Sequence, residues 1–110
     1  MNPTYQPILT IKVKANNDIP AYRFVRANGQ LCNLEQRSIG VSEMSGVSGD
    51  LVPVISIGTC LVTAGGNINI GSDVISDAQG RAIQFTETGI VNGVALSSAT
   101  AGKLVKILLK

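Results

Sequence analysis

Two stretches of the chain, residues 40–55 and 93–108, carry the same residue pattern at a constant offset of 53. Each copy has the form of a short strand, a loop of small residues that ends in glycine, and a second strand. The matched residues are Gly40-Val41 with Gly93-Val94, Ser45 with Ser98, Gly49 with Gly102, Leu51-Val52 with Leu104-Val105, and Val54-Ile55 with Ile107-Leu108. Two copies are too few for a solenoid of stacked repeats. The pattern therefore predicts one β-domain built from two similar halves.

A weaker correspondence precedes each copy. Residues 19–32 align without a gap with residues 70–83 at an offset of 51, and they share isoleucine, alanine and the turn glycines Gly29 and Gly80. Hairpins made of Gly, Val, Ser and Leu also resemble one another by chance, because these residues are common in strands and turns. Chance similarity is therefore the alternative explanation of the repeat.

Short strands alternate with turn signals along the whole chain. In residues 8–15, Leu9, Ile11, Val13 and Ala15 fall on one side and the lysines on the other, as in a half-buried strand. Asn28-Gly29 predicts a two-residue hairpin turn with both residues at positive φ, and Asp77-Ala78-Gln79-Gly80 predicts a four-residue turn. Strands are also expected at residues 21–27, 30–34, 38–42, 50–57, 59–64, 73–76, 81–85, 89–96 and 103–109.

The sequence thus predicts an all-β fold, a small single-domain β-barrel or β-sandwich of about nine or ten short strands. A length of 110 residues allows one core. We expect residues 1–7 to form an extended N-terminal arm, because Pro3 and Pro7 disfavour helix, and residues 8–110 to form a single β domain. The arm packs either on its own domain or on a neighbouring chain.

Charged residues make up only 15% of the chain, against about a quarter in a typical soluble domain, and the mean hydropathy is +0.29. Aromatic residues make up 4%, with no tryptophan, so the core should consist of small aliphatic side chains. A surface this poor in charge must expose apolar side chains, which mark contacts with other proteins. The composition therefore favours an assembled protein over a free monomer.

The sequence offers no set of residues suited to catalysis or to metal binding. The chain has no histidine, and Cys32 and Cys60 do not form a CxxC pair, which excludes the common zinc patterns. Both cysteines lie in apolar strand patterns and are expected to be buried. Asp73 and Asp77 are the closest-spaced acids, but Asp77 is better interpreted as the residue that opens a turn. We therefore expect no enzyme activity and no cofactor.

Nucleic-acid and membrane partners are also not expected. The basic residues are scattered, without a stripe or an aromatic stacking platform, and Lys12 and Lys14 are interpreted as a solvated or edge-protecting strand face. No segment has 18 consecutive apolar residues. Residues 1–5 lack the features of a signal peptide, so we expect cytosolic synthesis with both thiols free. Ser97, Ser98 and Lys103 are interpreted as ordinary loop residues rather than a Ser-Lys pair.

An ordered series of short motifs covers about residues 8–109. It comprises the strand 8–15, Ala21-Tyr22-Arg23-Phe24-Val25, Ile39-Gly40-Val41-Ser42, Ser48-Gly49-Asp50 before the strand 51–57, Gly71-Ser72-Asp73, Asp77-Ala78-Gln79-Gly80-Arg81-Ala82, Gly93-Val94-Ala95-Leu96, and Ala99-Thr100-Ala101-Gly102 before the strand 104–109. This order resembles that of the capsid decoration proteins, or head cement proteins, of tailed bacteriophages. Pro53 departs from the pattern of the family and suggests an edge position for its strand.

The resemblance implies a structural virion protein on the capsid exterior, made in the cytoplasm of the bacterial host. Such a protein binds the outer surface of the capsid and reinforces contacts between subunits of the major capsid protein, and many weak contacts on a closed lattice add up. It implies a homo-oligomer, with a trimer favoured. The contacts are expected from the apolar faces and from the arm residues Asn2, Pro3, Thr4, Tyr5, Gln6 and Pro7.

Two other functions are kept as alternatives. The first is a minor head-fibre or tail component, which would share this composition but differ in copy number. The second is a small β-barrel binding or carrier module, because lipoyl-type domains also consist of two similar β-halves. A carrier needs a modified lysine at a hairpin tip, and the tips Asn28-Gly29 and Asp77-Ala78-Gln79-Gly80 contain none. That absence counts against the carrier function.

Overall fold

The computed structural model describes residues 7–33, 36–86 and 88–109. These residues form eight β-strands and no helix, in one sheet with the order β2-β3-β4-β8-β7-β5-β6 and with β1 paired to β4. The strands are β1 (Pro7–Lys14), β2 (Phe24–Val25), β3 (Gly40–Ser42), β4 (Leu51–Thr63), β5 (Asp73–Ser76), β6 (Ala82–Gln84), β7 (Val91–Ala95) and β8 (Leu104–Leu109). A parallel bridge between Ala64 and Ala82 joins β6 back to the end of β4. The predicted all-β, barrel-like single domain is confirmed.

The pairing registers repeat from one half of the domain to the other. Strand β1 pairs with the first part of β4, and the last part of β4 pairs with β8. The two pairings have the same register. The pairs Ile11–Val54, Lys12–Pro53, Val13–Val52 and Lys14–Leu51 correspond to Cys60–Ile107, Leu61–Lys106, Val62–Val105 and Thr63–Leu104. The offset is 49 in the first strand of each ladder and 53 in the second. The domain therefore consists of two similar halves.

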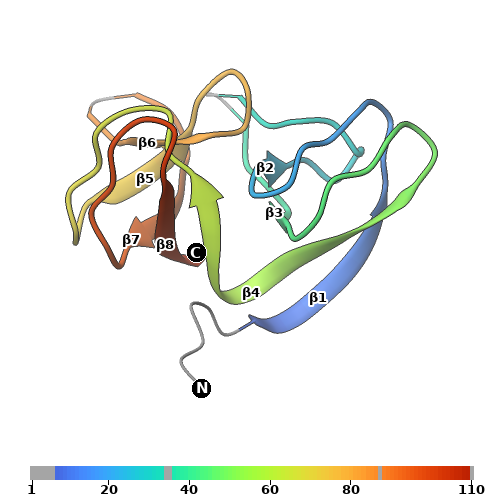
Figure 1. The fold of residues 1–110 in the computed structure, drawn as a ribbon, viewed down its shortest axis with the longest axis horizontal. Coiled ribbons are helices and arrows are strands. Elements are labelled where there is room, and N and C mark those ends of the chain that lie inside the picture. The colour runs from blue at the N-terminus through green and yellow to red at the C-terminus, as the bar shows by residue number, and fades with distance from the viewer. Residues whose placement is uncertain (1–6, 34–35, 87, 110) are drawn as a thin grey trace.

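Strand β4 belongs to both halves. It runs for 13 residues where the sequence predicted two strands, 50–57 and 59–64, and it bends where Pro7 of β1 lies opposite Gly58. Gly58 has a φ of 114°, a conformation that L-residues with a side chain rarely adopt. Figure 1 shows β1, β2 and β3 on one side of this bend and β5 to β8 on the other. No linker separates the two halves.

The merging of two expected strands into β4 accounts for part of the lower strand count. The rest comes from residues 30–34, where the described residues contribute only a bridge between Leu31 and Val25. The predicted turn at Asn28-Gly29 is wrong in type, because Gly29 has a positive φ of 84° and Asn28 does not. The N–H of Arg26 donates to Gln30 O (2.8 Å), which makes a three-residue loop, in which only the last residue needs the left-handed conformation.

The predicted turn at residues 77–80 is confirmed and has the same form. Gly80 N–H donates to Asp77 O (3.2 Å), Asp77 N–H donates to Arg81 O (2.8 Å), and Gly80 has a φ of 76°. The two carboxylate oxygens of Asp77 accept from the N–H groups of Gln79 and Arg81 and from Arg81 Nε, each at 2.8 Å. Asp77 therefore opens the turn, as predicted, and its carboxylate is committed to it.

Two clusters of buried aliphatic side chains form the core, and they repeat like the strands. The smaller cluster contains Val13, Ala15, Ile19, Val25, Val52 and Val54, whose equivalents in the second half are Val62, Ala64, Ile68, Val74, Val105 and Ile107 in the larger cluster. Phe24 of β2 is fully buried and packs in the larger cluster, so it joins the two halves. Cys32 and Cys60 are buried as predicted, and burial raises the pKa of Cys60 to about 12.

Pro53 does not mark an edge strand. Strand β4 lies between β1 and β3, and Lys12 is the partner of Pro53 on the β1 side. The carbonyl of Pro53 accepts from Glu43 N–H (2.9 Å), one residue beyond the end of β3. The missing N–H of the proline thus falls where β3 ends, which is why a central strand tolerates it.

Candidate interaction surface

Many large apolar side chains are exposed in the part of the chain that the structure describes. Thirteen of them are more than a third exposed, with Ile8 (78%), Ile70 (66%) and Leu51 (64%) the most open. Single exposed apolar residues are normal on a protein surface, but a group of neighbours indicates a contact site. The apolar surface predicted from the low charge content is therefore present.

Three of these side chains are neighbours at the bend of β4. Leu9 of β1 lies opposite Ile57 of β4, and Leu108 of β8 lies opposite Thr59, two residues further along β4. Leu9, Ile57 and Leu108 are 44%, 50% and 42% exposed, and we call them the bend patch. Diagonal neighbours on a sheet are close enough for long side chains to touch. The bend patch thus offers one apolar surface that spans both halves.

The predicted arm begins beside this patch. Pro7 is the first residue of β1 and lies opposite Gly58, next to Ile57. The arm residues Asn2, Pro3, Thr4, Tyr5 and Gln6 lie outside the described residues. Pro7, the last residue of the predicted arm, therefore lies at the bend, where Figure 1 shows the start of β1.

Ser97 and Ser98, which the sequence indicated to be ordinary loop residues, have structural roles. Ser97 Oγ accepts from Lys106 N–H (3.0 Å), and Ser98 Oγ accepts from Ile70 N–H (3.0 Å). Each serine therefore ties its loop to another segment. Residues 7–33, 36–86 and 88–109 hold no group of three or more His, Cys, Asp or Glu side chains that could bind a metal ion. The same residues contain no helix that is both long and apolar enough to cross a membrane.

A comparison with known protein families gives a match over almost the whole chain. The sequence pattern of the phage cement proteins matches residues 3–110. The chain belongs to the phage cement protein family. The resemblance to capsid decoration proteins that the strand and turn motifs indicated is therefore confirmed. Proteins of this family are structural components of phage particles.

The fold of this phage cement protein is shared with a solved structure from another phage. That structure is the crystal structure of the head fiber gp8.5 N base in bacteriophage phi29, with a TM-score of 0.76, 22% sequence identity and coverage of 93% of each chain. At this level of identity the likeness establishes the shared fold. No protein with a curated description matches the chain.

Proposed function

We propose that this phage cement protein binds the outer surface of a phage capsid and reinforces contacts between subunits of the major capsid protein. The family match over residues 3–110 is the observation that carries the proposal. The exposed apolar side chains support it, because a protein that works while attached to a shell can expose side chains that the shell covers. The chain acts as a structural part and has no catalytic role.

The bend patch and the arm, Asn2 to Pro7, are the contact surfaces that we propose. Full burial of a leucine or isoleucine contributes about 1.5–3 kcal/mol, so covering three half-exposed side chains supplies a few kcal/mol per copy. Many copies on one lattice make such modest contacts effective together. The chain also assembles with copies of itself, and a trimer fits a protein that sits among several shell subunits.

Empty heads assembled without the chain provide the test of this function. We expect the purified chain to bind them up to a fixed ratio to the shell protein, near one or a simple fraction of it, and to raise the temperature at which the shells break open. Quantitative mass spectrometry of washed heads gives the ratio, and calorimetry gives the temperature. Binding without a rise in that temperature would remove the reinforcing role.

A second candidate function is the base of a head fibre. Its support is the fold shared with the phi29 head fiber base. The copy number in purified phage particles separates the two functions, because a cement protein occurs in proportion to the shell protein whereas a minor fibre or tail component occurs in few copies.

Deletion of residues 1–6 is expected to weaken binding to empty heads by about tenfold and to leave the unfolding temperature unchanged. The reason is that β1 begins at Pro7, so the deletion removes none of its pairs with β4. Co-sedimentation with heads measures the affinity, and thermal unfolding followed by circular dichroism measures the fold. Affinity equal to that of the full chain would remove the arm from the interface.

Replacement of Ile57 with serine is expected to weaken binding to heads by about tenfold, which corresponds to about 1.4 kcal/mol of lost apolar contact. Ile57 is at the centre of the bend patch and half exposed, so the fold should lose little. The matched control is Ile70→Ser, an equally large change at a more exposed site in the second half. If Ile70→Ser weakens binding and Ile57→Ser does not, the patch has been placed on the wrong side.

A further inference from the structure

Strand β1 has an open edge. It pairs with β4 on one side, and Ala15, just beyond its end, exchanges hydrogen bonds with the same side, donating to Asp50 O and accepting from Gly49 N–H, each at 2.8 Å. Backbone groups alternate in direction along a strand. Those of Thr10, Lys12 and Lys14 therefore point away from β4, where none of the described residues forms a backbone hydrogen bond with them.

A groove runs along this edge. It has a volume of about 580 Å³ and lies between residues 11–16 on one side and Ala27, Asn28 and Ile39 on the other. Among the described residues, its lining includes two lysines and no carboxylate. A segment in extended conformation fits such a site because it can pair with the strand edge while its side chains fill the groove.

The second half of the domain uses the equivalent edge. Thr63 occupies the position of Lys14 in the repeated register, and its N–H donates to Tyr22 O of the first half at 2.8 Å. A backbone segment from outside the second half therefore already bonds to this edge position. The register relation identifies Lys14 N–H as the equivalent donor in the first half, where no described residue forms a backbone hydrogen bond with it. The edge closes just beyond this group, where Gly29 lies against Lys14 O and Asn16 N–H donates to Gly29 O (2.9 Å).

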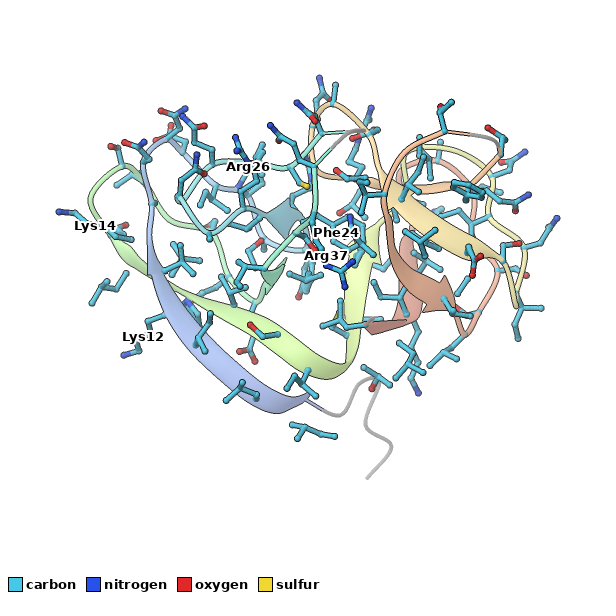
Figure 2. The ribbon with its side chains drawn as sticks, turned by 180° about the vertical axis from the view of Figure 1, so that it is seen from behind. Lys12, Lys14, Phe24, Arg26 and Arg37 are labelled. Atoms are coloured by element: carbon cyan, nitrogen blue, oxygen red, sulfur yellow. The ribbon has the colours of Figure 1, made fainter. Side chains whose placement is uncertain are left out.

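Charge distinguishes the open edge from the covered one. The positions of Lys12 and Lys14 are occupied by Leu61 and Thr63 in the second half. Figure 2 shows both lysine side chains projecting from β1 away from the body of the protein. Neither lysine has an ion-pair partner among the described residues. Two unpaired cations beside an open strand edge attract an extended segment that carries carboxylates.

We propose that the open edge of β1 binds an extended, acidic segment of the capsid shell protein by strand addition. The inference rests on the proposed function and names the chemistry of one of its contacts. The unpaired backbone groups favour a polypeptide over a nucleic acid or a lipid surface, because only a polypeptide strand offers both donors and acceptors at the repeat distance of the edge.

Two variants test the two parts of the proposal on empty heads made without the chain. Lys12→Pro removes an outward N–H that β4 does not use, so it blocks strand addition and is tolerated in an edge strand. The pair Lys12→Glu with Lys14→Glu reverses the charge and keeps the backbone. The matched control is Lys103→Glu with Lys106→Glu, which makes the same change in net charge at the start of β8. Co-sedimentation at low and high salt gives the affinities.

We expect both the proline variant and the charge-reversed pair to bind heads about tenfold more weakly or worse, while the control pair binds like the unmodified chain. The loss from charge reversal should shrink at high salt, and the loss from proline should persist. A normal affinity for Lys12→Pro would overturn strand addition, and a normal affinity for the charge-reversed pair would overturn the acidic segment. Equal losses in the control pair would also overturn it, because they indicate general attraction to the shell.

Amide hydrogen exchange of the unmodified chain decides the matter if Lys12→Pro does not fold. We expect exchange at residues 10–14 to slow when the chain is bound to heads, because strand addition covers the outward N–H groups. If the chain binds heads but exchange at residues 10–14 is unchanged, strand addition is overturned and the proposed function is not. If the unmodified chain does not bind heads at all, the proposed function fails and this inference fails with it.

Discussion

Replacement of Gly40 with alanine is expected to destabilise the domain by about 3 kcal/mol, a large effect for a single methyl group. Gly40 is the first residue of β3, and a Cβ atom there would overlap the backbone carbonyl oxygen of Ile55 and come within 2.7 Å of Val54 Cγ1. Backbone of a central strand cannot move aside as a flexible side chain can. Denaturant unfolding followed by circular dichroism measures the change, and the melting temperature should fall by roughly 10–20 °C.

Two further glycine variants act as controls for this result. Gly93 is the repeat equivalent of Gly40, and its Cβ would lie 2.8 Å from Leu108 O, so Gly93→Ala should destabilise in the same way but less. Gly49 has a φ of 96° and open space around the position of a Cβ, so Gly49→Ala should cost only about 1 kcal/mol from its backbone conformation. The overlap explanation is wrong if Gly40→Ala costs no more than Gly49→Ala.

Truncation of Phe24 to alanine is expected to destabilise the domain by about 3–5 kcal/mol. Phe24 has the largest fully buried side chain among the described residues. It packs from β2 of the first half into the cluster that contains Cys60, Val74 and Ile107 of the second half. Its loss leaves a cavity where the two halves meet. Unfolding in denaturant measures the effect, and the transition should stay single because the halves share β4.

Phe85 provides the matched control, since the chain has only two phenylalanines. It follows β6 and is only partly buried, so Phe85→Ala should destabilise the domain by less than Phe24→Ala. An equal loss from both variants would show that burial at the meeting point of the halves is not what makes Phe24 important.

The sequence predicted the features that depend on local chemistry. The turn at residues 77–80 was correct because Asp77 and Gly80 each have a role that few other residues fill, a carboxylate that accepts two backbone N–H groups and a φ of 76°. The repeat at an offset of 53 was correct for a similar reason. Gly40 and Gly93 both lie too close to the neighbouring strand to carry a side chain. Because this close contact occurs in both halves, glycine recurs at both positions of the sequence repeat.

The upstream half of the repeat was aligned only in part. The turn glycines Gly29 and Gly80 do correspond at an offset of 51, but the strands before them correspond at 49 and those after them at 53. The second half has two additional residues before its turn and two after it, so an alignment without gaps could follow only one of the three offsets. The identities at an offset of 49, Val13 with Val62, Ala15 with Ala64 and Ile19 with Ile68, were a signal that separate searches at each offset could find.

The bend patch could not be predicted from alternation along residues 8–15. That pattern placed Leu9 on the core side with Ile11, Val13 and Ala15, whereas Leu9 is 44% exposed. The register of β1 against β4 shifts on both sides of Leu9, which changes the direction of its side chain. An irregularity of this kind depends on the partner strand and its bend, and the sequence of one strand does not reveal it.

The continuity of β4 has a mechanical consequence. Chains with two lobes are commonly joined by a loop that lets the lobes swivel, but here the last strand of one lobe is the first strand of the other. The spacing of the lobes is thus fixed by covalent backbone, with hydrogen-bonded neighbours on either side of the bend. Groups held by the two lobes are kept at one separation, which under the proposed function selects binding points of one matching spacing on the shell.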